Sequence, residues 1–480
     1  GVARAARRLT AARLAERVAR EGIALPEGLA DALIEDGHEA DARHRSERSL
    51  IRELAAEAPL LELADVPGGS SRERVRALAG AITGSGPPRG TPGGRARGPR
   101  RARPTPPAAS AATLDGPLAG ARIVVVCGSG GVGKTTVSAA VAIRLAESGR
   151  RTALLTVDPA RRLATALRLP PTAGERTRVG LGRGRSLEAM QLDTKRTFDE
   201  LVERFAGSRE RRDRILGNAF YRRIADTLGG THEYMAMEKL HQLAEEETHD
   251  AIVIDTPPTR SALSFLDAPG RLTDFLGGRL LRWMLRPSMG AGRLTLGAAR
   301  LGATAFLHAA GRLVGSAALA DLAEFLAAFE GMFGGFEERA SRVVELLRSD
   351  GCAFLVVTAP AGPSLEEAGF FLDRLAQGGM RAGPVVVNRW RPAGVILPGR
   401  AARASSKLAG GGLEDRAAAA VLDCRLRRAP AETEAAEAMA GFAAGHPDVS
   451  LVAVPDLSGP VLDVPGLRRV GAHLFGSGVR

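Results

Sequence analysis

The residues from Cys127 to Thr136 read Cys-Gly-Ser-Gly-Gly-Val-Gly-Lys-Thr-Thr, a glycine-rich segment that ends in one lysine and two hydroxyl side chains. It follows the apolar run Ile123–Val126 and precedes the helix-forming run Val137–Ala146. A strand, a G-x-x-x-x-G-K-[ST] loop and a helix in this order form a phosphate-binding loop, because the glycines let backbone N–H groups close around phosphate oxygens at a helix N-terminus. The segment therefore predicts a nucleotide-binding site.

The side chains of this loop have distinct expected roles. Lys134 is expected to reach the β- and γ-phosphates and to act in catalysis, and the Thr135 hydroxyl is expected to hold Mg²⁺. A compact ammonium fits beneath a phosphate better than a guanidinium fork does. The predicted nucleotide-binding residues of the loop are Ser129, Gly130, Gly131, Val132, Gly133, Lys134, Thr135 and Thr136.

Two aspartates stand at the ends of apolar runs further along the chain. Asp158 follows the run 152–157. An aspartate at this position could orient or deprotonate the water that attacks the γ-phosphate, or it could cap the following helix, and both roles are compatible. Asp255 ends the run 251–255 and is suited to hold a Mg²⁺-bound water. With the phosphate loop, these two acids predict a catalytic residue at Asp158 and a metal-site residue at Asp255.

The spacing of apolar runs predicts the architecture. Short β-branched runs alternate with helical patterns, which is typical of a doubly wound α/β fold with a mostly parallel sheet and ligands at the carboxyl ends of its strands. We expect a helical insertion at about 195–248 and 265–348, including an amphipathic helix at 319–333 and a strongly apolar stretch at 280–289. That stretch forms either the core of a helical subdomain or a groove for a hydrophobic client. The predicted strands are 122–127, 152–157, 251–255, 353–358, 384–388 and 450–454.

Three segments are expected along the 480 residues. Residues 1–83 look helical, residues 84–117 form a Pro/Gly/Arg-rich linker, and residues 118–480 form the nucleotide-binding domain. A Pro-x-x-x-Leu-x-x-Val-Pro pattern at 59–67 recurs at 447–455, and a Leu/Arg-rich helix follows each copy. The repeat suggests that residues 1–83 are the tail of an upstream, related unit.

Composition narrows the function classes. There are 66 Lys and Arg against 54 Asp and Glu, a formal charge of +12, but only four of the basic residues are lysine. Such an arginine bias reflects genome composition, so charge is weak evidence for nucleic-acid binding and we expect no nucleic-acid partner. The three cysteines (127, 352 and 424) contain no C-x-x-C pair, and the apolar run 301–320 is interrupted by His308 and Arg312. The chain is therefore expected in the cytoplasm, with peripheral membrane association left open.

Taken together, these motifs resemble the ArsA family of deviant-Walker ATPases over about residues 120–475. The resemblance rests on Gly-Gly-Val-Gly-Lys-Thr-Thr, on Asp158-Pro-Ala-x-x-Leu and on Asp255-Thr-x-Pro-Thr. It is strongest to actinobacterial members, through the stretches 192–200, 233–240 and 332–336. The resemblance implies ATP and Mg²⁺ as ligands, Asp158 in switch I and Asp255 at the start of switch II. It also implies that Asn388 reads adenine and that Pro455 packs beside the base.

The family comprises arsenite-efflux ATPases and ATPases that target tail-anchored membrane proteins, and this chain departs from both. Ser129 stands where the family carries a lysine that reaches the partner's nucleotide, so a symmetric sandwich dimer that uses this lysine is not expected. The three cysteines form no evident trio for a metalloid, and the C-x-x-C of zinc-linked dimers is absent. A second ATPase unit, as a hetero- or pseudo-dimer, is the expected partner.

Three functional classes remain open. The first is a Mg²⁺-dependent ATPase that couples switch movement to an anion-transport or membrane-protein partner. The alternative is a nucleotide-gated chaperone or targeting factor that binds hydrophobic helices. A positioning ATPase like MinD or ParA is disfavoured by Ser129 and by the long helical insertion. GTP is disfavoured because Asn388 precedes Arg-Trp-Arg instead of Lys-x-Asp.

Overall fold

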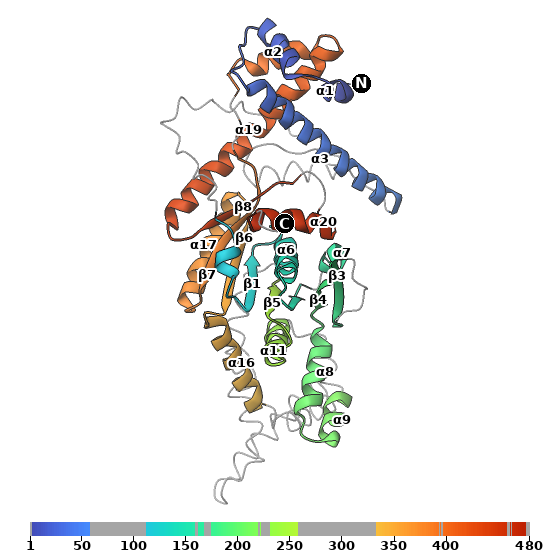
Figure 1. Ribbon diagram of the computed structural model, residues 1–480, viewed down its shortest axis with the longest axis vertical. Helices are drawn as coiled ribbons and strands as arrows, with labels where there is room; N and C mark the ends of the chain where they lie inside the picture. Colours follow the sequence, from blue (N-terminus) through green and yellow to red (C-terminus); the bar gives the residue numbers. More distant parts are fainter. Residues whose placement is uncertain are drawn as a thin grey trace, which may run out of the picture. The chain divides into compact units, whose positions relative to one another are not determined.

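The described residues fall into two compact units, each considered by itself (Figure 1). A computed structural model of the protein describes residues 2–57, 112–158, 162–167, 174–218, 221, 231–257, 333–392, 394, 397–457, 461 and 463–476. Of these, residues 2–57, 394, 397–433 and 457 form a helical unit, and the others form a unit built on a sheet. Three predicted segments lie outside the described residues: the helix at 319–333 except for its last residue, the apolar stretch 280–289, and most of the linker.

The sheet unit contains eight strands in the order β3-β4-β2-β5-β1-β6-β7-β8. Every neighbouring pair is parallel except β3 with β4, so the carboxyl ends of seven strands meet at one edge. This confirms the predicted doubly wound α/β fold. The strands are β1 Ile123–Gly128, β2 Thr152–Thr156, β3 Thr177–Gly182, β4 Arg185–Gln191, β5 Ala251–Asp255, β6 Cys352–Thr358, β7 Ala382–Trp390 and β8 Leu451–Pro455.

The hairpin of β3 and β4 was not among the predicted strands. Its two strands have alternating exposure, unlike β1, β2, β5 and β6, which are buried throughout. Gly182, Arg183 and Gly184 all have positive φ angles, which makes the tight reversal. A short edge strand with polar residues on its open face has no continuous apolar run, and this is why the apolar pattern does not reveal it.

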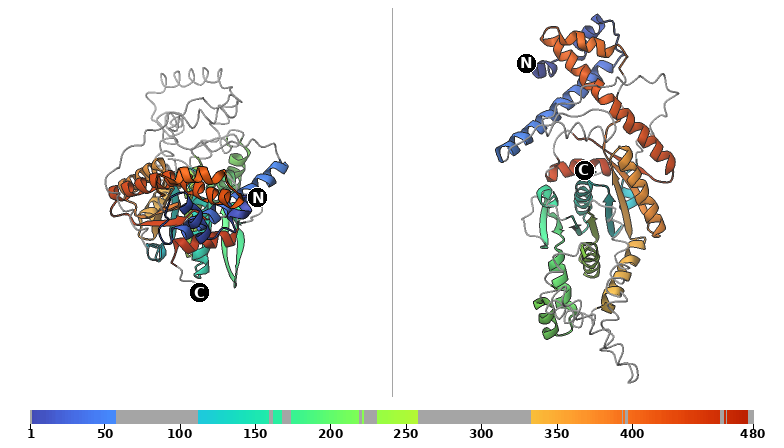
Figure 2. Two further views of the ribbon diagram at one scale, coloured as in Figure 1. Left: turned by 90° about the horizontal axis from the view of Figure 1, so that it is seen from above. Right: turned by 180° about the vertical axis from the view of Figure 1, so that it is seen from behind.

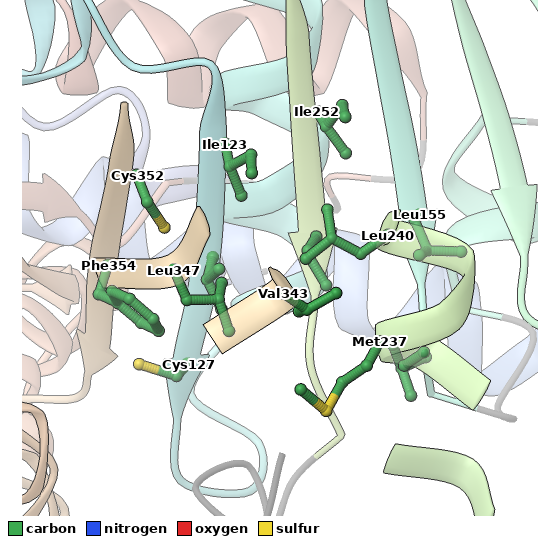
Figure 3. Packing of buried hydrophobic residues seen from close by; sticks show 14 of the residues in the cluster. Ile123, Cys127, Leu155, Met237, Leu240, Ile252, Val343, Leu347, Cys352 and Phe354 are labelled. Carbon is green, nitrogen blue, oxygen red and sulfur yellow. The ribbon is translucent and has the colours of Figure 1, made fainter. Parts of the chain in front are cut away.

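Helices cover both faces of the sheet. Ile123, Val125 and Cys127 of β1 pack in one apolar cluster with residues of α8, α11, α16 and α17. Figure 3 shows side chains that α11 and α16 contribute to this cluster. On the opposite face of the sheet, α6 and α20 pack together. Continuous burial of β1 follows from this double cover. The helices of this unit are α5 Asp115–Leu118, α6 Lys134–Glu147, α7 Arg162–Leu167, α8 Thr194–Phe205, α9 Arg209–Gly217, α11 Thr231–Glu245, α16 Phe333–Arg348, α17 Gly362–Gln377 and α20 Val464–Leu474.

The helical unit brings the first described residues together with a late part of the chain. Figure 2 shows α1 Val2–Ala6, α2 Ala11–Arg20 and α3 Leu29–Glu57 beside α18 Ala401–Ala409 and the first part of α19 Leu413–Gly445. The division between the units falls within α19, after Thr433. Leu14, Val18 and Leu33 share one buried cluster with Leu408 and Leu422. The Thr10 side chain caps the N-terminus of α2.

Ion pairs join the same helices. Arg425 is buried and its guanidinium contacts Asp36 at 3.2 Å and also pairs with Glu432. Arg17 pairs with Glu414 and Asp415. Among the described residues, no helix combines the length and the apolar character needed to cross a membrane.

Candidate nucleotide site

The backbone of the glycine-rich segment forms a tight loop between β1 and α6. Gly128 has a φ of 142°, and a Cβ there would lie 2.0 Å from the Val357 carbonyl oxygen, which only glycine avoids. Gly133 has a φ of 97° and is the N-cap of α6, which begins at Lys134. The loop therefore ends at a helix N-terminus, where free N–H groups and the helix dipole favour an anion.

Lys134 and Ser129 contact each other across the loop. The Lys134 ammonium is buried and donates a hydrogen bond to the Ser129 carbonyl oxygen at 2.8 Å. The Ser129 Oγ is enclosed and has no hydrogen-bond partner among the described residues. A buried ammonium at the base of a glycine loop is suited to neutralise phosphate charge.

Asp255 lies at the centre of a network of hydroxyl groups. Its carboxylate is fully buried at the end of β5 and accepts hydrogen bonds from Ser138 at 3.2 Å and Thr156 at 3.0 Å. Burial raises the pKa of Asp255 to about 6, although hydrogen bonds from Thr135 and Thr156 and the charge of Lys134 act in the opposite direction. Ser138 thus links the end of β5 to α6, and the two side chains predicted for the metal site, Thr135 and Asp255, belong to these two elements.

These two side chains fit a magnesium ion. Mg²⁺ prefers oxygen ligands, and in nucleotide sites it uses one or two protein groups together with phosphate oxygens and water. The Thr135 hydroxyl would bind such an ion directly, and the buried Asp255 carboxylate would hold one of its waters. Ser138 and Thr156 fix the carboxylate but did not appear in the predicted site, because they lie 117 and 99 residues from Asp255 in the sequence.

Asp158 lies at the same edge of the sheet as the loop. It is buried two residues beyond β2, and its backbone carbonyl accepts a hydrogen bond from the Gln191 side chain at 3.3 Å. The preceding residue, Val157, donates its N–H to the Asp255 carbonyl oxygen at 2.9 Å. The structure therefore places both predicted acids at the ends of adjacent strands.

Asn388 and Pro455 come from the other side of the sheet. The Asn388 amide is buried in β7 and donates a hydrogen bond to the Val132 carbonyl oxygen of the loop at 2.7 Å. Pro455 ends β8 and pairs in register with Trp390, two residues beyond Asn388. The loop residues, Asp158, Asp255, Asn388 and Pro455 therefore all stand at the carboxyl edge of the parallel strands, as expected for a doubly wound fold.

A second polar cluster lies among the helices on the face of the sheet that α11 covers, called the α11 face below. It was absent from the predicted site. The Arg339 Nε of α16 donates to both carboxylate oxygens of Glu238 of α11, at 3.1 and 2.9 Å. The Tyr234 hydroxyl also donates to Glu238, and the Arg339 guanidinium lies 4.1 Å from the centre of the Phe205 ring of α8. A cavity of about 110 Å³ adjoins this cluster. The sequence gave no signal for this ion pair, because Glu238 and Arg339 are 101 residues apart in the chain.

The cysteines are separated. Cys127 and Cys352 are buried in the neighbouring strands β1 and β6, but the register pairs Cys352 with Ile123, so the two thiols stand about 13 Å apart along the strands. Burial raises the pKa of each thiol to about 12. Cys424 belongs to the helical unit. The two strand thiols are thus neither adjacent nor ionised at neutral pH.

Comparison with known proteins agrees with this geometry. Residues 121–302 match the family model described as anion-transporting ATPase, ArsA_ATPase. The chain is 26% identical over 282 residues to a protein named as an arsenical pump-driving ATPase of Aquifex aeolicus, which covers 57% of this chain and 65% of that protein.

Two further relatives have other names. ATPase BagA of Mycobacterium tuberculosis is 29% identical over 171 residues, covering 34% of this chain and 49% of that protein. ATPase get3 of Pyrenophora tritici-repentis is 30% identical over 152 residues, covering 31% of this chain and 43% of that protein. The chain thus spans between two fifths and two thirds of the length of these relatives. With the phosphate loop, the strand-end acids and the doubly wound sheet, these matches show that residues 121–302 of the chain are similar to the ArsA family of ATPases.

Proposed function

We propose that this protein is a Mg²⁺-dependent ATPase of the ArsA type. The observation that carries the proposal is the buried Asp255 carboxylate, held by Ser138 and Thr156, at the same edge of the sheet as the phosphate loop and its buried Lys134 ammonium. A hydroxyl, a carboxylate and an ammonium at the N-terminus of α6 form the set of groups that binds a metal–nucleotide complex. The family similarity and the ATPase names of the relatives support the same activity.

Each residue has a defined part in the proposed reaction. Backbone N–H groups of residues 129–136 bind the phosphates, and Lys134 neutralises charge that develops on the γ-phosphate and the leaving oxygen. Asp158 orients the attacking water and accepts its proton. Asn388 and Pro455 hold the adenine. Bound Mg²⁺ would supply charge neutralisation at the β- and γ-phosphates.

Hydrolysis would be coupled to movement of the segments that follow Asp158 and Asp255. Contacts made to the γ-phosphate and lost after hydrolysis are the usual source of such switching. We propose an anion-transport or membrane-protein partner as the recipient, in line with the family description. In this family a lysine at the position of Ser129 reaches the partner's nucleotide. Because that lysine is replaced here, we propose pairing with a second, non-identical ATPase unit. We also propose that any association with a membrane is peripheral and not integral.

A nucleotide-gated chaperone or targeting factor is the second candidate. It is favoured by the apolar sequence at 280–289, which contains Leu, Trp and Met side chains suited to a hydrophobic helix. Crosslinking of the full chain to a hydrophobic helical peptide, with ATP and with ADP, separates the two candidates. Nucleotide-dependent crosslinks would favour the chaperone, and their absence together with stimulation by an oxyanion or metalloid would favour transport.

Turnover measurements test the ATPase itself. Lys134→Ala should abolish phosphate release and weaken ATP binding, whereas Asp158→Asn should retain ATP binding and lose at least about 100-fold in kcat. Lys407→Ala is a matched control, because Lys407 is an exposed lysine of the helical unit that pairs with Glu21 at 3.0 Å. Unchanged turnover in Lys134→Ala would show that the site is wrongly assigned.

A further inference from the structure

The side-chain amide of Asn388 has an unambiguous orientation. Its Nδ2 donates to the Val132 carbonyl oxygen at 2.7 Å, and its Oδ1 accepts from the Arg389 backbone N–H at 3.0 Å. A carbonyl oxygen only accepts and a backbone N–H only donates, so the amide cannot be rotated without losing both bonds. Asn388 is 8% exposed, and its bond to Val132 is buried whereas its bond to Arg389 is partly buried.

The bond to Val132 controls the geometry of the phosphate loop. The Val132 carbonyl and the Gly133 N–H belong to one planar trans peptide and point in opposite directions. Fixing the carbonyl on Asn388 therefore directs the Gly133 N–H away from Asn388. The approach is close, because a Cβ on Gly133 would lie 2.2 Å from the Asn388 Nδ2.

The strand that carries Asn388 is itself held in an unusual conformation. Arg389 has a φ of 59°, and the β7–β8 register shifts between Val387 and Trp390. The bulge is fixed on the β8 side, where the Asp456 N–H donates to the Trp390 carbonyl oxygen at 3.1 Å and the Asp456 carboxylate pairs with Arg391. A left-handed arginine persists only where its surroundings enforce it, which is common at ligand sites.

The amide retains capacity for a ligand. A side-chain amide has two N–H donors and two acceptor lone pairs, and the two bonds formed among the described residues use one of each. One donor and one acceptor lone pair remain. That pair complements an adenine edge, which offers an N–H₂ donor next to a ring-nitrogen acceptor.

We propose that Asn388 is a positioning residue of the phosphate loop as well as the residue that contacts adenine. One side chain would then couple recognition of the base to binding of the phosphates. The inference rests on the proposed binding of ATP at this loop. It differs from a role in base reading alone because it makes binding of a ligand without any base depend on Asn388.

Mg²⁺-tripolyphosphate is the probe that separates these roles, since it carries the phosphates of ATP and no base. Calorimetry of the full chain would compare binding of ATP and of tripolyphosphate in wild type, Asn388→Ala and the nearly isosteric Asn388→Leu. Loss of a buried hydrogen bond that leaves a carbonyl without its donor should weaken tripolyphosphate binding roughly tenfold or more. Asn218→Ala is the matched control, because Asn218 is also a buried amide and lies at the end of α9.

The outcomes are distinct. Weakened binding of both ligands in the two Asn388 variants, with Asn218→Ala like wild type and all proteins folded by circular dichroism, supports the positioning role. Loss of ATP affinity with unchanged tripolyphosphate affinity overturns it and leaves a residue that only reads the base. If wild type binds neither ligand, or if Lys134→Ala binds both as wild type does, the proposed function fails instead.

Discussion

The Ser138 hydroxyl of α6 lies 3.2 Å from the carboxylate of Asp255 at the end of β5, inside the protein. The first helix after the phosphate loop is thereby connected to the strand that carries the second acid. Because the acid is buried, its ionisation state is linked both to stability and to binding of a cation.

The first prediction concerns the pH dependence of stability without ligand. The pKa of Asp255 is about 6 in the folded protein against an ordinary 3.8, so its stabilising contribution is fully present below the ordinary value and is lost as pH rises through about 6. The difference corresponds to about 3 kcal/mol. Urea unfolding of wild type and Asp255→Asn between pH 4 and 8 measures it. A stability difference between the two proteins that does not vary with pH would contradict the assignment.

The second prediction concerns Ser129. Its Oγ is enclosed without a partner among the described residues, so Ser129→Ala should leave the stability of the ligand-free protein unchanged or raise it by up to about 1 kcal/mol. If the hydroxyl donates to a phosphate oxygen, the same variant should bind ATP about threefold to tenfold more weakly. Thermal unfolding with and without ATP reports both quantities. A destabilised variant with normal ATP affinity would point to a purely structural hydroxyl.

The third prediction concerns the ion pair of Glu238 and Arg339. Their side chains are 3% and 11% exposed, so removing one partner leaves a buried charge and should cost about 3 kcal/mol. Glu238→Gln and Arg339→Met should each be destabilising, and the double variant should lose much less than their sum. Urea unfolding of the four proteins gives the coupling. Additive losses would mean that the pair contributes little beyond packing.

The fourth prediction concerns thiol reactivity. Burial and a pKa of about 12 should keep Cys127 and Cys352 unreactive toward an aromatic disulfide reagent at pH 8, whereas the partly exposed Cys424 should react. Unfolding should release the two others. Arsenite should not stimulate turnover through these residues, and Cys424→Ser should respond to arsenite as wild type does. Two fast thiols in the folded protein would require a different arrangement of β1 and β6.

Residues adjacent in sequence made the core of the site predictable. The glycines of the loop 128–136 indicate its backbone geometry directly. Asp158 and Asp255 each stand at the end of an apolar run, and parallel strands bring such ends to the same edge of a sheet. The six predicted strands and the parallel sheet are confirmed. Whether Asp158 and Asn388 act as expected stays a prediction.

Contacts between segments that are distant in the sequence could not be predicted from local sequence patterns. Asn388 and Val132 are 256 residues apart, and no local pattern signals that an amide in β7 holds a loop after β1. Arg339 and Glu238 pose the same problem on the α11 face. In β3 the polar residues of the open face interrupt the apolar pattern, so the sequence does not indicate the hairpin. The hairpin is recognised only from the structure, in which β4 pairs with β2.

The pairing within the helical unit has a consequence for biosynthesis. The hydrogen bond of Arg13 with Glu414 joins residues 401 positions apart, and that of Arg425 with Asp36 joins residues 389 apart. At typical translation rates of about 5–20 residues per second, α2 and α3 would wait about 20–80 s for α18 and α19 to be synthesised. During that interval the apolar faces of α2 and α3 lack their final partners on the nascent chain, which makes them candidates for ribosome-associated chaperones.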